Sequence, residues 1–179
     1  MSTRLFTHTL LGTISIGLLL ATADASAFTS GRVLRKNEEG GTTAGKFRAG
    51  QGPNGGTLAR GRALKTDGAG NGKFVSNGAF QGPNGATGAR AGQTTVNADG
   101  SASHNSGFQA NGSKGSVQSS GSATRSADGT VDQSRTTTAT SAATGNTMKT
   151  TESYSKDSGL TRSSTCTDAG GNSIACPSR

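Results

Sequence analysis

Large apolar residues are scarce in this sequence once its first 27 residues are set aside. Folding costs roughly 1–2 kcal/mol of backbone entropy per residue, and each Å² of buried apolar surface contributes only about 25 cal/mol. The large apolar residues of 28–179 cannot stabilise a two-layer globular domain, and so low a content is typical of disorder. They are Phe28, Val33, Leu34, Phe47, Leu58, Leu64, Phe74, Val75, Phe80, Val96, Phe108, Val117, Val131, Met148, Tyr154, Leu160 and Ile174.

Residues that build active sites are also scarce. The chain has no tryptophan and two histidines, and His104, the only histidine after residue 27, has no partner constellation in the sequence. Ser153 and Lys156 have the spacing of a lysine-activated serine, but such a lysine needs a desolvated pocket. We therefore expect no enzyme activity, no cofactor, no metal site and no small-molecule substrate. The aromatic residues form no cluster that would stack on bases.

The first 27 residues predict a cleavable secretory signal. Arg4 precedes the apolar run of residues 10–23, which ends at the small residues Ala25 and Ala27. A membrane anchor needs about 20 consecutive apolar residues, and polar residues interrupt this run. We expect a signal helix, cleavage between Ala27 and Phe28, and export to the periplasm, the cell surface or the medium. No second hydrophobic segment follows, so we expect no integral membrane segment in the mature chain.

The net charge of +8 belongs entirely to the mature chain, because Arg4 and Asp24 cancel. Such a chain associates electrostatically with anionic surfaces. The candidate partners are lipopolysaccharide, teichoic acid, acidic polysaccharide and extracellular nucleic acid. The alternative is that the charge serves only solubility.

Both cysteines, Cys166 and Cys176, lie near the C-terminus with a Gly-rich turn between them. An exported chain meets an oxidising compartment, where pairing is the default. We expect a disulfide-closed hairpin, and the chain-entropy model gives so small a loop roughly 3 kcal/mol of stabilisation. The spacing fits neither a redox motif nor a metal site.

A loose internal repeat runs through the middle of the chain. Residues 52–60 recur thirty positions later as residues 82–90, and three Asp-Gly pairs stand 32 and 29 positions apart. Fixed periods of 20 to 50 residues are typical of stacked or solenoidal units. Asn-Gly and Asp-Gly pairs are also strong signals for hairpin turns. We therefore expect turn glycines at Gly68, Gly100, Gly112 and Gly129.

Runs rich in Ser, Thr, Val and Phe separate these turns and predict strands. The fold class expected is all-β, with polar antiparallel hairpin or meander repeats in a single-layer or solenoid-like sheet and with substantial disorder. The alternative is an intrinsically disordered chain. The predicted arms cover residues 57–65, 73–80, 87–96, 101–109, 114–126, 130–142, 147–156, 160–167 and 173–176.

Four segments follow from these patterns. Residues 1–27 are the signal, residues 28–46 a mixed arm that is one short strand or disordered, residues 47–156 the degenerate repeats of about thirty residues, and residues 157–179 the disulfide-closed hairpin.

The low-complexity composition and the hairpin turns resemble those of small secreted proteins that build bacterial surface fibres, such as curli subunits. The fixed Ser and Gln ladder of curli repeats is absent, so no residue role carries over. Two functions remain open. One is a secreted or envelope structural or interaction protein that self-associates by strand pairing and uses its cationic surface. The other is a largely disordered cationic binder of anionic envelope polymers or extracellular nucleic acid.

Overall fold

The computed structural model describes residues 27–177, and almost all of them lie in strands or short turns. None of these residues forms a helix that could cross a membrane. The strands are β1 (Phe28–Lys36), β2 (Thr42–Gln51), β3 (Thr57–Thr66), β4 (Gly72–Gln81), β5 (Thr87–Val96), β6 (Ala102–Gly112), β7 (Gly115–Arg125), β8 (Val131–Ser141), β9 (Thr147–Ser155), β10 (Gly159–Thr167) and β11 (Ser173–Ile174).

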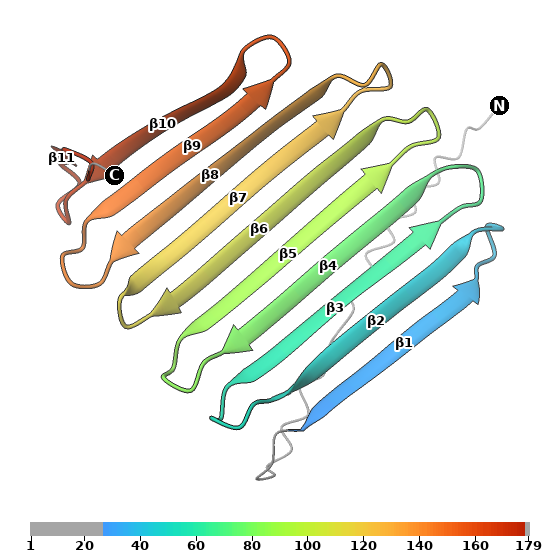
Figure 1. The fold of residues 1–179 in the computed structure, drawn as a ribbon, viewed down its shortest axis with the longest axis horizontal. Coiled ribbons are helices and arrows are strands. Elements are labelled where there is room, and N and C mark those ends of the chain that lie inside the picture. Colours follow the sequence, from blue (N-terminus) through green and yellow to red (C-terminus); the bar gives the residue numbers. More distant parts are fainter. Residues whose placement is uncertain (1–26, 178–179) are drawn as a thin grey trace, which may run out of the picture.

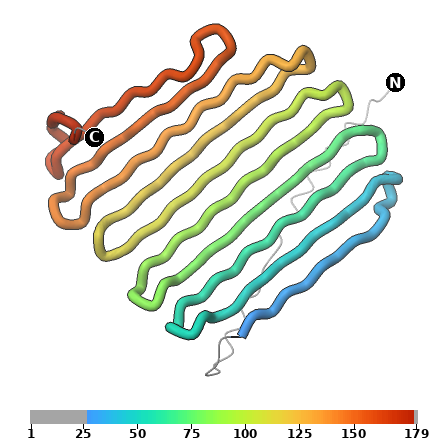
Figure 2. Tube along the Cα trace, viewed as in Figure 1, coloured from blue at the N-terminus to red at the C-terminus, as the bar shows by residue number. Residues whose placement is uncertain are grey.

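The strands form one antiparallel sheet in which every strand pairs with its neighbour in sequence. Figure 1 shows them side by side in a single layer, and Figure 2 follows the chain as it zigzags from one edge to the other. The sheet does not close on itself, and no second layer of described residues packs on it. The all-β prediction is therefore confirmed, as is the single-layer antiparallel meander.

Six of the turns share one hydrogen-bonding pattern. In the turn that follows β5, Asn97 N donates to Ser101 O at 2.9 Å and Gly100 N donates to Asn97 O at 3.0 Å. This is the type I turn with a glycine bulge that suits longer hairpin loops. Gly100 has a φ of 83°, and no described residue other than glycine has a positive φ. In the turns at Gly100 and Gly129 the preceding aspartate also accepts a hydrogen bond of 2.9 Å from the backbone N–H two residues on, while glycine alone takes the left-handed conformation.

The spacing of these turns explains the repeat. Segments 52–60 and 82–90 both begin in a turn and run into the following strand, β3 and β5. Two strands and two turns fill one period, so the repeat unit is one hairpin of the meander and not a coil of a solenoid. The strands from β2 to β5 have the same length, so the turns between them recur at regular intervals.

Large aromatic rings lie on glycines across the strands and help to fix the register. Phe80 is directly opposite Gly88, and Phe47 is directly opposite Gly31. A Cβ atom added at either glycine would collide with the facing phenylalanine ring. Each ring therefore covers backbone of the next strand, although Phe47 remains 53% and Phe80 41% exposed.

The segment 28–46, for which one short strand and a disordered arm were both left open, is ordered. It forms all of β1 and the start of β2. The substantial disorder expected along the chain is not seen in the described residues either. Disorder was predicted because few large apolar side chains are available for burial. The ten ladders instead provide hydrogen bonds to the backbone of almost every described residue. Residues 1–26 of the predicted signal segment, which include the predicted helix and Ala25, lie outside the described residues.

Candidate functional site

Side chains alternate between the two faces of the sheet, and the pairing register decides which residues share a face. Partners across each ladder align into rows that cross all the strands. One row runs Phe28, Gly50, Leu58, Phe80, Gly88, Ala110, Val117, Ala139, Met148, Cys166 and Ile174. We call the face that carries this apolar row the basic face, because most cations of β1 to β5 lie on it, and the other the polar face.

Six cations gather at the middle of β1 to β5 on the basic face. They occupy two neighbouring rows, and we call them the basic cluster: Arg32, Lys46 and Arg62 in one row, and Arg48, Arg60 and Arg90 in the next. Neighbouring strands are about 4.8 Å apart, so the cluster presents a dense positive surface. Like charges directly opposite one another destabilise a sheet, which makes this arrangement costly unless an anion is bound.

No carboxylate of the described residues balances the basic cluster. Two ion pairs form among the described residues, Lys65 with Glu39 at 2.7 Å and Arg162 with Glu152 at 3.5 Å. Neither includes a member of the basic cluster. The neighbouring Arg62 guanidinium lowers the pKa of the Lys46 ammonium, with partial burial and then Arg32 and Arg60 adding to the effect. The cluster is therefore an uncompensated cationic surface.

The cluster lines a shallow groove of about 830 Å³. Phe28, Phe74 and Phe108 border this groove with the cations, and the guanidinium of Arg48 lies 4.2 Å from the centroid of the Phe28 ring. The aromatic residues are thus brought together with the arginines, although they are far apart in sequence. The arrangement combines charged donors with flat apolar surfaces on one open face.

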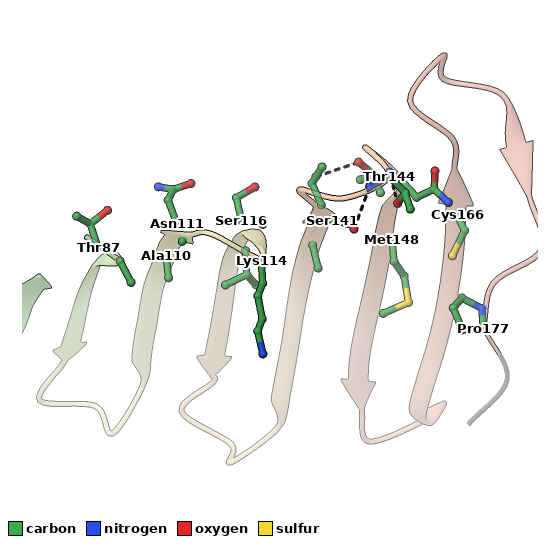
Figure 3. A pocket seen from close by; sticks show the side chains of 18 of the residues that line it. Thr87, Ala110, Asn111, Lys114, Ser116, Ser141, Thr144, Met148, Cys166 and Pro177 are labelled. Atoms are coloured by element: carbon green, nitrogen blue, oxygen red, sulfur yellow. Dashed lines mark hydrogen bonds between the residues drawn. The ribbon is translucent and has the colours of Figure 1, made fainter. Parts of the chain in front are cut away.

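The apolar row forms a second hollow beside this groove, of about 740 Å³. Figure 3 shows Ala110, Met148 and Cys166 pointing to one side of the sheet, while Thr87, Asn111 and Ser116 point to the other. Small residues such as Ala110 and Ala139 lie between Phe80 and Met148, and this difference in size makes the hollow. Both hollows therefore lie on the basic face.

Hydroxyl groups replace the cations farther along the same rows. Arg135 donates from Nη1 to Ser119 at 2.9 Å and from Nη2 to Ser106 at 3.1 Å. Ser119 and Thr137 share a hydrogen bond of 2.9 Å, and Thr150 and Ser164 share one of 3.0 Å. This half of the face satisfies its own polar groups and leaves little free charge.

Both edges of the sheet are open in the part of the chain that the structure describes. β1 pairs only with β2, so the outer backbone groups of β1 have no strand beside them. β11 pairs only with Cys166 and Thr167 of β10, so the rest of the outer edge of β10 is free. Open edges are templates for pairing with another chain.

The predicted disulfide between Cys166 and Cys176 is confirmed, with a Cα–Cα distance of 5.2 Å. Cys166 is the only large apolar or sulfur-bearing side chain of the described residues that is buried, at 4% exposure. The bond fastens β11 against the end of β10. The C-terminal hairpin thus covers one corner of an otherwise open edge.

The predicted turn glycines fall in different positions. Gly68, Gly100 and Gly129 lie in turns with φ between 75° and 89°. Gly112 is instead the last residue of β6 and pairs with Gly115, which has the positive φ at that hairpin. This hairpin has a two-residue loop, and the residue after the loop, Gly115, takes the positive φ in place of Gly112. Phe28, the residue after the predicted cleavage point, begins β1.

Sequence reasoning missed the basic cluster and the aromatic residues beside it. Its six members are spread over almost sixty positions, and only the ladder register places them together. The signal was present as an alternation, because Arg60 and Arg62 stand two positions apart, as do Lys46 and Arg48.

No group of three or more His, Cys, Asp or Glu side chains within the described range could hold a metal ion.

No protein family model, curated protein or solved structure matches this chain.

Proposed function

We propose that the chain is an exported structural or interaction protein that acts through strand pairing and a cationic surface, without catalysis. The observation that carries the proposal is the open single-layer sheet of residues 27–177, which within that range has two free edges and a face of exposed apolar residues and unpaired cations. A protein built this way gains stability when another chain covers its edges or faces. The signal predicted at residues 1–27 gives export, and cleavage before Phe28 leaves β1 whole.

Self-association is the first part of this function. Sedimentation velocity of the mature chain, residues 28–179, across a wide range of concentrations tests it together with circular dichroism. We expect β-rich particles whose mass grows with concentration. A single monomeric species at every concentration would contradict this part.

Binding of anionic polymers is the second part, and the basic cluster favours it. Electrostatic binding falls steeply with salt, because each contact releases condensed counterions. Labelled oligodeoxythymidine and polygalacturonate serve as phosphate and carboxylate probes, read out by fluorescence anisotropy in a salt series. Binding that does not change with salt would remove the electrostatic basis. The ordered sheet of the described residues favours a folded cationic surface over the largely disordered binder.

A further inference from the structure

β1 and β10, the two long strands with open outer edges in the described part of the chain, have edges that match each other. β1 and β10 are each nine residues long. They run in opposite directions, because neighbouring strands of the meander alternate in direction and β1 is odd-numbered while β10 is even-numbered. A second copy displaced along the sheet without rotation therefore brings its β1 antiparallel to β10 of the first copy.

Hydrogen bonds at the ends of the sheet show which backbone groups point off each edge. Gln51 N donates to Ala27 O at 3.1 Å, so the odd-numbered residues of β1 bond inward to β2. Asp168 N donates to Asn172 O at 2.9 Å on the β11 side, so the even-numbered residues of β10 point toward the free edge. The outward groups are therefore those of even-numbered residues on both strands.

The same even-numbered positions carry the most exposed apolar side chains. Leu34 of β1 is 77% exposed and Leu160 of β10 is 74% exposed, more than any other large apolar residue in the described part of the chain. Both lie on the basic face in one cross-strand row, at its two ends. Continuing the row from one copy to the next places these leucines opposite each other.

We infer that copies of this chain join head to tail, with β1 of one copy added to β10 of the next. The inference rests on the strand-pairing part of the proposed function and specifies its interface. In this register Leu34 is opposite Leu160, and residues 29–35 pair with residues 159–165. The backbone N–H and C=O groups of Leu34 and Leu160 face one another, as an antiparallel hydrogen-bonded pair requires.

The disulfide hairpin sets where this pairing ends. β11 already occupies the outer side of Cys166 and Thr167. An incoming β1 can therefore pair only up to residue 165 of β10. Its next residue, Phe28, meets Ile174, which already occupies the position beside Cys166. The disulfide holds β11 at this corner, so the hairpin acts as a stop that favours one register.

Competing arrangements place worse partners together. Two β1 strands paired with each other would bring together Arg32, Arg35 and Lys36 from both copies, and like charges across a ladder are unfavourable. A shift of two residues would place each leucine opposite a polar or charged residue. The inferred register does place Arg32 opposite Arg162, but Glu152 lies 3.5 Å from Arg162 and offsets its charge.

Repetition of one heterologous contact gives an open linear assembly. Each added copy continues the meander. Its basic face lies on the same side as that of the copy before it, so the basic cluster repeats along the assembly. The exposed edge then exists only at the two ends. The single-layer sheet of each copy becomes one segment of a longer ribbon.

Cross-linking between differently labelled copies tests the interface. One preparation carries Leu34→Cys and another carries Leu160→Cys, while Cys166 and Cys176 stay in their native disulfide. The two are mixed and treated with a short bis-maleimide, and products are separated by non-reducing electrophoresis and mapped by mass spectrometry. We expect a cross-linked dimer in the mixture at least tenfold more abundant than in either preparation alone. Val33→Cys, on the opposite face, is the matched control in place of Leu34→Cys.

Each outcome decides between interfaces. Equal cross-linking by Leu34→Cys alone would show β1 paired with β1 and overturn the inference. Sedimentation that detects association without the mixed cross-link would also overturn it, while the broader strand-pairing function would stand. Absence of any association would remove both. As a second measure, Ser164→Pro deletes an outward N–H of β10 and should block association, while Ser164→Ala should leave it unchanged and circular dichroism should confirm that both variants fold.

Discussion

The two halves of the sheet share one backbone design but carry different side chains. Residues 28–96 contain ten Lys and Arg against three Asp and Glu, whereas residues 97–179 contain seven against six. Both halves use the same glycine-bulge turn, for example at Gly85 and at Gly129. The same turns and ladders therefore hold the backbone in both halves, although the halves differ in charge.

Equivalent rows show how the halves diverge. In β2 and β3 the central row pairs Arg48 with Arg60, and in β8 and β9 the same row pairs Thr137 with Thr150. Neither arginine has an ion-pair partner among the described residues, while Thr150 bonds to Ser164. The first half therefore has unsatisfied charge to offer a partner, and the second half closes its own hydrogen bonds.

The largest effect is expected from removing charge in the first half. The triple change Arg48→Gln, Arg60→Gln and Arg62→Gln should weaken binding of oligodeoxythymidine by about 10- to 100-fold at low salt. It should also reduce the slope of log affinity against log salt by about 2, since each lost phosphate contact removes roughly 0.7 from the slope for a single strand. Anisotropy titrations at several salt concentrations give both quantities.

A control of equal charge sits on the polar face. Arg35, Lys73 and Lys149 point away from the basic cluster. Their triple replacement by glutamine removes the same net charge but should leave most of the affinity intact. If both triple variants lose affinity equally, binding follows net charge and the contrast between the two faces has no functional meaning.

Turn glycines should give the next largest effect, and it should be the same in both halves. Gly85 and Gly129 have φ of 76° and 89°, and nothing lies within 4 Å of a Cβ atom built on either. Replacing either by Val should therefore cost about 1–2 kcal/mol from backbone strain alone. Urea unfolding curves of the single variants measure this cost.

Gly112 provides the control for this prediction. It lies in β6 without a positive φ, and an added Cβ would only touch Ala86 at 3.5 Å. Gly112→Ala should therefore leave stability within about 0.5 kcal/mol, as for a surface change away from special features. Unequal losses at Gly85 and Gly129 would mean that the halves differ in backbone stability as well as in side chains.

The hairpins were predictable because their signals are local. Asp99-Gly100 and Asp128-Gly129 mark turns within a few residues, and the predicted arm 87–96 coincides with β5. β2 was missed, and β1 was left open between a short strand and disorder, because Arg and Glu residues and two adjacent glycines obscure the turn at residues 37–41. The basic cluster could not be found in the same way, since membership depends on which residue of one strand faces which residue of the next. Register over four successive ladders is a property of the whole sheet.

Loss of the disulfide should have a smaller effect, confined to the second half. The double change Cys166→Ser and Cys176→Ser releases β11, which contacts the sheet through two residue pairs. Amide hydrogen exchange should accelerate at residues 173–174 and at the end of β10, with no change in β1 to β5. Accelerated exchange across the first half would show that the hairpin supports the whole sheet and does more than mark one corner.

The smallest effect concerns the pH dependence of the turns. Hydrogen bonds from the side chains of Asn71 and Asn172 lower the pKa of Asp67 and of Asp168, respectively, and the Ser101 side chain lowers the pKa of Asp99. A carboxylate whose pKa is lower in the folded state than in the unfolded state stabilises the fold above the unfolded pKa, near 3.9. That contribution is lost as the pH falls through the lowered folded pKa. Since these carboxylates are solvent-exposed, the loss per turn is small, and it appears as a gradual decrease in melting temperature below about pH 4.

Asp99→Asn keeps an acceptor oxygen for Ser101 but cannot titrate, so it should flatten this decrease slightly without changing stability at neutral pH. Carboxyl NMR titration gives each pKa directly. An ordinary pKa at Asp67, the turn aspartate of the first half, together with a lowered one at Asp168 in the second would break the equivalence of the turns on which the comparison of the halves depends.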